Sequence, residues 1–232
     1  MHMISSGVQG SRKLFWKNVR LECERFCEEH LKLNQWELLA AMQALLIYIL
    51  RRLDEGETDH NNFDSLLLTT VTVIAKQLTR SDITCNTQPA LCNYDLEKGW
   101  KDWIFEESKR RLCVVYQAVN MLVYFEPAAL CNLQTDLILA PLPATKQLWE
   151  AVDEFAWKTE SERGPGAQTS FGLAANGDLV KLDEGQLYCS DAALLHNSLN
   201  SGALRSTANW GEWCSGMDGF GGLVMLAASL IG

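Results

Sequence analysis

The chain has 232 residues, of which 47% are hydrophobic and 21% are charged, a composition typical of a globular protein that can bury a substantial core. It carries 29 acidic and 20 basic side chains, and the formal charge of −9 disfavours a free-standing nucleic-acid-binding protein. No apolar stretch reaches the roughly 20 residues of a membrane span, and the N-terminus lacks the pattern of a signal peptide. These features predict an intracellular protein, neither secreted nor bound to a membrane, in which residues 1–10 are a tag or linker remnant.

Long helices are predicted in the first half of the chain, where apolar side chains recur at spacings of three and four residues. The first helix is expected to begin near Phe15. The second begins at Asn34, a favourable N-cap with Glu37 as its capping-box partner. The second helix is apolar on nearly every side, which predicts a central, buried position. The third spans about residues 63–78 and the fourth about residues 96–125.

The rest of the chain is expected to be less regular, since twelve of the sixteen glycines follow residue 160. Residues 161–166 are predicted to form a loop, and residues 185–199 and 223–231 weaker helices. A further helix is predicted after Pro143, with four side chains facing inward: Leu148, Trp149, Val152 and Phe155. The predicted fold is therefore all-α, a single globular helical domain over residues 11–232 with a glycine-rich, less regular C-terminal third.

The sequence contains few residues whose pattern suggests a metal site or a catalytic site. Cys23, Cys27 and His30 share one face of the first predicted helix and are the clearest candidate metal ligands. We favour a structural role for them, because apolar side chains lie on the same stripe and no fourth ligand is nearby. Motifs of hydrolases, metalloproteases and P-loop proteins are absent, and the glycine-rich segment 216–222 does not fit a dinucleotide-binding loop. We therefore expect no enzyme activity, metal or cofactor, and we expect segment 216–222 to form a tight, closely packed turn.

Six consecutive polar residues, from Glu106 to Arg111, interrupt the fourth predicted helix. A helix has 3.6 residues per turn, so these six positions cannot all face solvent. At least one of Glu107, Arg110 and Arg111 is expected to face a neighbouring element and to need a partner there. We expect one of the two arginines to bond a carboxylate outside its own helix, with Asp136 as a candidate partner besides Glu107.

The same helix begins a series of motifs: WKDWIFEESKRR at residues 100–111, LAPLP at 139–143 and LWEA at 148–151. Together they resemble the central homology region of fungal-specific transcription factors of the zinc-cluster type, especially members found beside secondary-metabolite pathways. The similarity covers about residues 34–231. The residues that match the pattern are Trp100, Trp103, Glu107, Arg110, Arg111, Pro141, Pro143 and Trp149. For these positions we expect structural roles, with the tryptophans as core anchors and the arginines as ties to neighbouring segments.

The resemblance implies an all-α regulatory domain, nuclear in the intact protein, that controls transcription by conformational coupling to a small-molecule effector, a protein partner or a second copy. The family's six-cysteine zinc cluster, and the two-Cys, two-His finger of some relatives, are absent from this sequence. DNA is therefore expected to be contacted only through a finger outside this chain. A helical scaffold for protein interaction or dimerisation is the alternative function, and a small-molecule-processing all-α enzyme is a third.

The last residues suggest that the chain is a fragment. The apolar segment 223–231 is followed only by Gly232, with no charged final turn and no polar tail. An apolar helix this short is marginal in water unless it packs on something. We expect it to pack on the glycine-rich turn and on earlier helices, or else on a partner or on a continuation of the chain.

Overall fold

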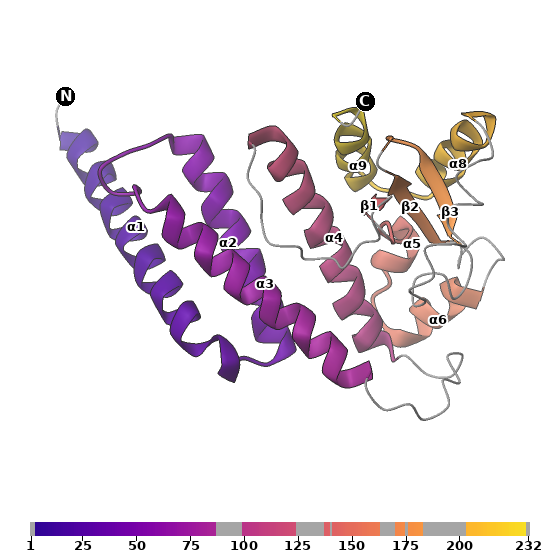
Figure 1. Cartoon of the computed structure of the whole chain (residues 1–232), viewed down its shortest axis with the longest axis horizontal. Helices are drawn as coiled ribbons and strands as arrows, with labels where there is room; N and C mark the ends of the chain where they lie inside the picture. Colours follow the sequence, from indigo (N-terminus) through magenta and orange to yellow (C-terminus); the bar gives the residue numbers. More distant parts are fainter. Residues whose placement is uncertain are drawn as a thin grey trace. The chain divides into compact units, whose positions relative to one another are not determined.

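Helices make up most of the described chain, so the all-α prediction is confirmed apart from one small sheet (Figure 1). A computed structural model describes residues 3–86, 99–123, 137–139, 141–162, 170–174, 176–182 and 203–230. These residues belong to two compact units, where the sequence predicted one domain. Helices α1 to α3 form the first unit, and α4 and the elements after it form the second.

The first unit consists of α1 (Met3–Glu29), a short 3-10 turn η1 (His30–Lys32), α2 (Gln35–Glu55) and α3 (Asp64–Asn86). Helices α1 and α2 each pack against α3. Helix α1 begins well before the predicted start and includes residues 3–10, which the sequence marked as a remnant. The main buried side chains of this unit are Trp16, Val19, Cys23, Leu38, Met42, Leu45, Ile49, Leu67, Val71 and Ile74.

Helix α2 begins as predicted. Asn34 Oδ1 accepts hydrogen bonds from the backbone N–H groups of Trp36 at 2.9 Å and Glu37 at 3.1 Å. The Glu37 carboxylate accepts the Asn34 backbone N–H at 2.8 Å, which completes the capping box. The prediction that α2 is buried on nearly every side is wrong, since Ile47 is 61% exposed and Leu50 is 44% exposed. Two neighbouring helices cover one face of a helix and leave the other uncovered.

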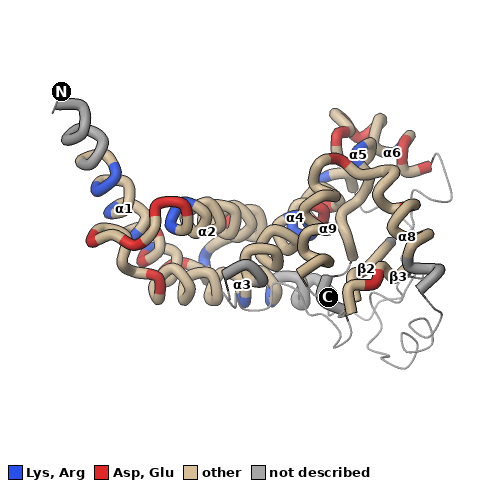
Figure 2. Tube along the Cα trace, turned by 90° about the horizontal axis from the view of Figure 1, so that it is seen from above, with Lys and Arg blue, Asp and Glu red and all other residues tan. Residues whose placement is uncertain are grey.

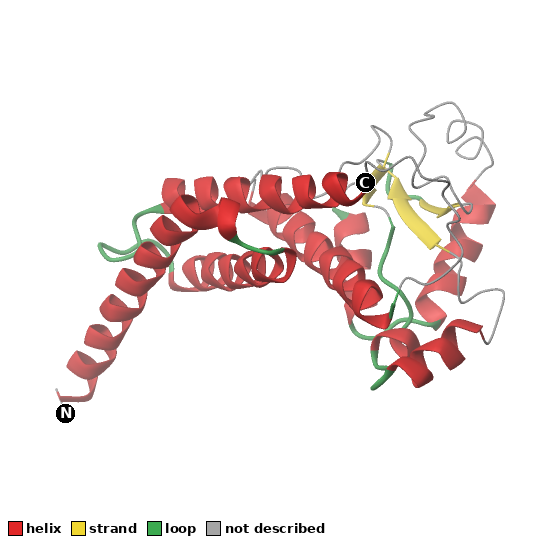
Figure 3. Ribbon diagram, turned by 90° about the horizontal axis from the view of Figure 1, so that it is seen from below, coloured by secondary structure: helices red, strands yellow, loops and turns green. Residues whose placement is uncertain are grey.

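The second unit contains the helices α4 (Trp100–Val123), α5 (Lys146–Trp149), α6 (Glu154–Glu162), α8 (Ala203–Ser215) and α9 (Phe220–Ser229). Its strands are β1 (Leu137–Leu139), β2 (Ser170–Ala174) and β3 (Leu179–Leu182). They form an antiparallel sheet in the order β1-β2-β3, drawn in yellow in Figure 3. Helix α9 packs against α4, and α8 packs against β3.

The sheet and α8 were not predicted from the sequence. Strands β2 and β3 are joined by a tight turn in which Gly177 has φ of 82°, a backbone conformation that favours glycine. The Gly177 N–H donates to the Ala174 carbonyl at 3.0 Å, and the Ala174 N–H donates to the Asp178 carbonyl at 2.9 Å. These contacts close a hairpin, the strand arrangement that a short turn of this kind produces.

The helix predicted after Pro143 is only partly correct. It is divided into the four-residue helix α5 and the separate helix α6, which Asp153 caps by accepting the Ala156 N–H at 2.7 Å. Leu148 is buried as predicted, but Val152 is 84% exposed and Phe155 is 81% exposed. The break between α5 and α6 removes the helical periodicity that would have placed these two side chains on the face of Leu148.

The remaining predictions concern the C-terminal third. Helix α9 matches the predicted helix at 223–231, with Gly221, Val224 and Ala227 buried. The predicted loop 161–166 begins within α6, and its residues 163–166 lie outside the described residues, as does the predicted helix at 185–199. Among the described helices, none has the length and apolar character that a membrane span requires.

Candidate functional site

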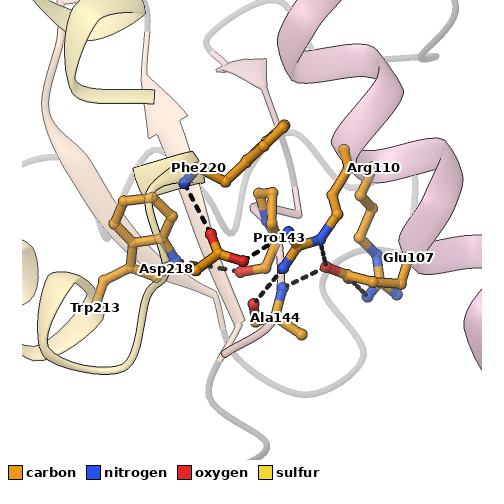
Figure 4. A network of polar contacts seen from close by, with 8 residues as sticks. Glu107, Arg110, Pro143, Ala144, Trp213, Asp218 and Phe220 are labelled. Carbon is orange, nitrogen blue, oxygen red and sulfur yellow. Dashed lines mark hydrogen bonds and ion pairs between the residues drawn. The ribbon is translucent and has the colours of Figure 1, made fainter. Parts of the chain in front are cut away.

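The carboxylate of Glu107 is the centre of a polar network in the second unit (Figure 4). Its side chain is 0% exposed. Oε1 accepts hydrogen bonds from Arg111 Nε at 3.0 Å and from the Ala144 N–H at 2.9 Å, and Oε2 accepts one from Arg110 at 3.1 Å. A buried carboxylate persists only when it is paired and hydrogen-bonded, because its removal from water costs several kcal/mol. The expectation that one of these charges faces a neighbouring element is confirmed.

Arg111 connects α4 to segments that are distant in the sequence. Besides Glu107, its guanidinium donates to Asp218 Oδ2 at 3.1 Å and to the Ala144 carbonyl at 3.4 Å. The predicted carboxylate partner outside the helix is therefore present, and it is Asp218. The other candidate, Asp136, lies outside the described residues.

Two aromatic rings also contact the Arg111 guanidinium. Its Cζ atom lies 4.4 Å from the ring centroid of Trp149 and 5.2 Å from that of Phe220. At these distances the negative face of an aromatic ring attracts a cation. Because Trp149 belongs to α5 and Phe220 to α9, this one side chain contacts both helices.

Asp218 lies in the turn between α8 and α9. Its Oδ1 accepts the Phe220 N–H at 2.8 Å, while Oδ2 accepts Arg111. Partial burial tends to raise the pKa of Asp218, but these hydrogen bonds and the charges of Arg111 and Lys146 outweigh that effect and lower the pKa below its usual value. The sequence offered one indication that Asp218 has a specific role, because it is one of only four charged residues after Gly185.

We expect Asp218 to make the stability of the protein depend on pH in the acid range. A carboxyl whose pKa is lowered by folding stabilises the fold above its ordinary pKa of 3.8, and this contribution is lost as the pH falls through the lower folded-state pKa. The free energy of unfolding should therefore decrease below about pH 5, and it should decrease less in Asp218→Asn. Urea unfolding at several pH values measures both, and identical pH profiles would contradict the assignment.

The proline segment before α5 positions the backbone that contacts Glu107. Pro143 is buried, and its carbonyl accepts a hydrogen bond from Trp213 Nε1 at 3.4 Å. Pro141 is half-buried. The two prolines restrict the backbone φ on either side of Leu142, whose N–H donates to the Phe171 carbonyl at 2.7 Å. The segment is thus attached to β2, and the next N–H along the chain, that of Ala144, donates to the Glu107 carboxylate.

The glycine-rich segment after α8 is closely packed, as predicted. A Cβ atom on Gly216 would lie 2.8 Å from Thr145 Cγ2, and one on Gly221 would lie 3.0 Å from Met217 Cβ. The Gly216 carbonyl accepts the Lys146 N–H at 2.8 Å. The absence of a side chain at Gly216 therefore allows the segment to bond the start of α5.

Gly216→Ala is expected to lower the free energy of unfolding by about 1–3 kcal/mol, because Thr145 is β-branched and its methyl group has little freedom to move away. Gly222→Ala is the matched control, since a Cβ atom there meets no atom within 4 Å. In the helix α9 that substitution should instead stabilise the protein by up to about 1 kcal/mol. Thermal or urea unfolding distinguishes the two, and equal effects would contradict the close packing.

The tryptophans expected as core anchors are not deeply buried. Trp100, Trp103 and Trp149 are all half-buried. Trp103 and Trp157 have ring centroids 5.9 Å apart. Trp100 and Trp103 lie in the first turn of α4, where fewer neighbours are available than at mid-helix. The core along α4 is formed instead by Phe105, Leu112, Val114, Tyr116 and Val119.

The three candidate metal ligands of the first unit take part in packing and local hydrogen bonds. Cys27 Sγ is 3.4 Å from Thr70 Oγ1, and His30 Nδ1 is 2.8 Å from the Cys27 carbonyl. Cys23 is buried, and this burial raises the pKa of its thiol to about 11, which opposes the thiolate form that binds metals. Within the described residues there is no group of three His, Cys, Asp or Glu side chains that could hold a metal.

Comparison with known proteins does not identify a relative. No family model, curated protein or solved structure matches this chain. The role of the network therefore has to be argued from its geometry. Both oxygens of Glu107 and both of Asp218 accept hydrogen bonds from protein groups. This arrangement connects α4 to the segments that begin α5 and α9.

Proposed function

We propose that this chain is the regulatory domain of a fungal transcription factor, which acts by conformational coupling to an effector or partner and not by catalysis or direct DNA readout. The supporting observation is that the three resembling motifs, which are separate in the sequence, meet in one network. Glu107 and Arg111 come from the first motif and Trp149 from the third. The second motif takes part through Ala144, the residue directly after Pro143, which bonds both Glu107 and Arg111. Asp218 adds the glycine-rich segment to the same contacts.

A network of this kind provides a physical route for coupling. Moving α9 away from α4 would separate Arg111 from Asp218 and leave its charge incompletely paired. Moving α5 away would remove the contact of Arg111 with the Trp149 ring. The network therefore favours one arrangement of these elements. An effector that binds a second arrangement more tightly shifts the balance by its difference in affinity for the two. The effector is a small molecule or a protein, and in this proposal the intact protein acts in the nucleus.

The proposal is tested by placing the chain between a heterologous DNA-binding domain and an activation domain in a fungal reporter strain. We expect reporter output to differ from that of a fusion without the chain. Asp218→Asn should change this difference, because it weakens the link between α4 and α9. Glu212→Gln is the control, since the Glu212 side chain is 47% exposed and pairs only with Lys181 among the ion pairs of the described residues.

Immunoblotting must show equal amounts of each fusion, so that a change in output reflects activity and not abundance. Output that is the same with and without the chain would contradict a regulatory role. Native mass spectrometry of the purified chain complements the reporter, because a retained small molecule would identify the class of effector.

A further inference from the structure

Helix α2 carries an exposed stripe with no charge. Between Glu37 and Arg51 the helix has no charged residue, so the middle of α2 is tan in Figure 2. Most of the apolar side chains in this stretch are buried in the first unit. Four residues of the stretch are exposed and form what we term the α2 stripe: Ala40, Gln43, Ile47 and Leu50. Their spacing of three, four and three residues places them along one line of the helix, as in the seam of a coiled coil.

We propose that the α2 stripe binds a second copy of this chain, with the two α2 helices antiparallel about a two-fold axis beside Gln43. In a two-fold contact between identical chains, every pair occurs twice: if one residue contacts a second residue of the partner subunit, that second residue also contacts the first residue of the partner subunit. Ala40 and Ile47 lie on opposite sides of Gln43 and at nearly equal distances along the helix. Antiparallel pairing therefore places the small Ala40 against the large Ile47 of the partner subunit. The two-fold axis repeats this pair on its other side, and a small residue opposite a large one allows close packing.

The charges at the two ends of the stripe favour the same pairing. Glu37 lies before the stripe and Arg51 after it, so an antiparallel partner places Glu37 near Arg51 of the partner subunit at both ends. A parallel partner would instead place like charges together, which is unfavourable. Arg51 contacts Asp54 at 3.2 Å and Glu55 at 2.7 Å, and its side chain remains 45% exposed. A guanidinium has five N–H donors, so it can bond a further carboxylate.

Gln43 suits a position at the axis. Its amide both donates and accepts hydrogen bonds, so two copies of the same side chain can bond each other. A charged residue there would face its own copy and repel it. Ala40 and Ile47 are thus complementary in size, and Gln43 is complementary to its own copy in hydrogen bonding. Together with the charges of Glu37 and Arg51, this supports a second copy as the occupant over an unrelated partner.

Sedimentation velocity of the whole chain tests the proposal. A single pair of helices makes a small interface, below the roughly 1,200 Å² of stable complexes, so we expect a monomer–dimer equilibrium with a dissociation constant in the micromolar range. The measurement should therefore cover concentrations from about 1 to 300 µM. The proposal does not depend on a role in transcription, because the assay uses no effector and no DNA.

Variants of the stripe test the register. Ala40→Glu and Ile47→Lys should each weaken dimerisation by about tenfold or more, because each places a charge in an apolar contact. The double variant A40E/I47K should recover much of this loss, since the introduced opposite charges then face each other across the axis. In a parallel dimer the double variant would instead be the weakest, because like charges would meet.

Phe155→Lys is the matched control, since Phe155 is 81% exposed but belongs to the second unit. It should dimerise like the wild type, and circular dichroism should show that every variant keeps its helix content. A wild type that remains monomeric to the highest concentration would overturn the proposal. So would an Ile47→Lys variant that dimerises normally, or a double variant no better than the single ones.

Discussion

Glu107→Ala is expected to lower the free energy of unfolding by about 3–5 kcal/mol, the effect of removing one partner from a buried ion pair. The substitution leaves the Arg111 guanidinium, whose side chain is only 10% exposed, without its nearest carboxylate. It also leaves the Ala144 N–H without the acceptor that it bonds at 2.9 Å. Most domains are stable by only about 5–15 kcal/mol, so a loss of this size removes a large part of the total. Urea unfolding of the wild type and variant measures it.

The adjacent residue provides the control. Glu106 lies in the same helix, its side chain is 34% exposed, and it contacts Lys109 at 3.4 Å. Exposed pairs three or four residues apart contribute little, so Glu106→Ala should change stability by no more than about 0.5 kcal/mol. A similar loss for both variants would show that the carboxylate of Glu107 has no special role and that the helix itself is the sensitive feature.

Features that depend on a few neighbouring residues were predicted correctly. The capping box of Asn34 and Glu37 involves residues three positions apart, so its hydrogen bonds require no partner distant in the sequence. The expectation that at least one of Glu107, Arg110 and Arg111 faces a neighbouring element followed from the 3.6-residue period of the helix, because six polar residues in a row cannot all face solvent. In both cases the local geometry of the helix was sufficient.

The hairpin was missed although the sequence carried a signal for it. Asn176 and Gly177 lie between two short apolar segments, a combination that favours a tight turn between strands. The strands themselves have only five and four residues, too few for a clear alternation of buried and exposed positions. The length of helix α5 was overestimated. The apolar spacing after Pro143 suggested one long helix, but the helix ends at Trp149.

Partners distant in the sequence could not be predicted from the sequence. Arg111 and Asp218 are 107 positions apart, and only the packing of α9 on α4 brings them together. The expectation of a fully buried α2 failed for a related reason. Apolar character shows that a helix face avoids water, but it does not show which element covers that face. Some apolar residues of α2 are left exposed, such as Ile47, which is 61% exposed. If a second copy covers the α2 stripe, that contact accounts for them.

Arg111→Ala is expected to cost about 2–4 kcal/mol, and Arg110→Ala only about 1 kcal/mol. Arg111 bonds Glu107, Asp218 and the Ala144 carbonyl, whereas Arg110 is 25% exposed and bonds Glu107 from the edge of the network. Arg111→Lys should restore little of the loss, because a single ammonium group cannot span acceptors on three segments as a planar guanidinium does.

A double-mutant cycle separates the Arg111–Asp218 pair from the other contacts of the network. Asp218→Asn should destabilise the wild type, but it should have a much smaller effect in the Arg111→Ala background, because the partner is already absent. Residues in direct contact show coupling energies of about 0.5–3 kcal/mol in such cycles. Additive effects of the two substitutions, or an equal cost for Arg110→Ala and Arg111→Ala, would contradict the view that Arg111 is the side chain that holds α9 on α4.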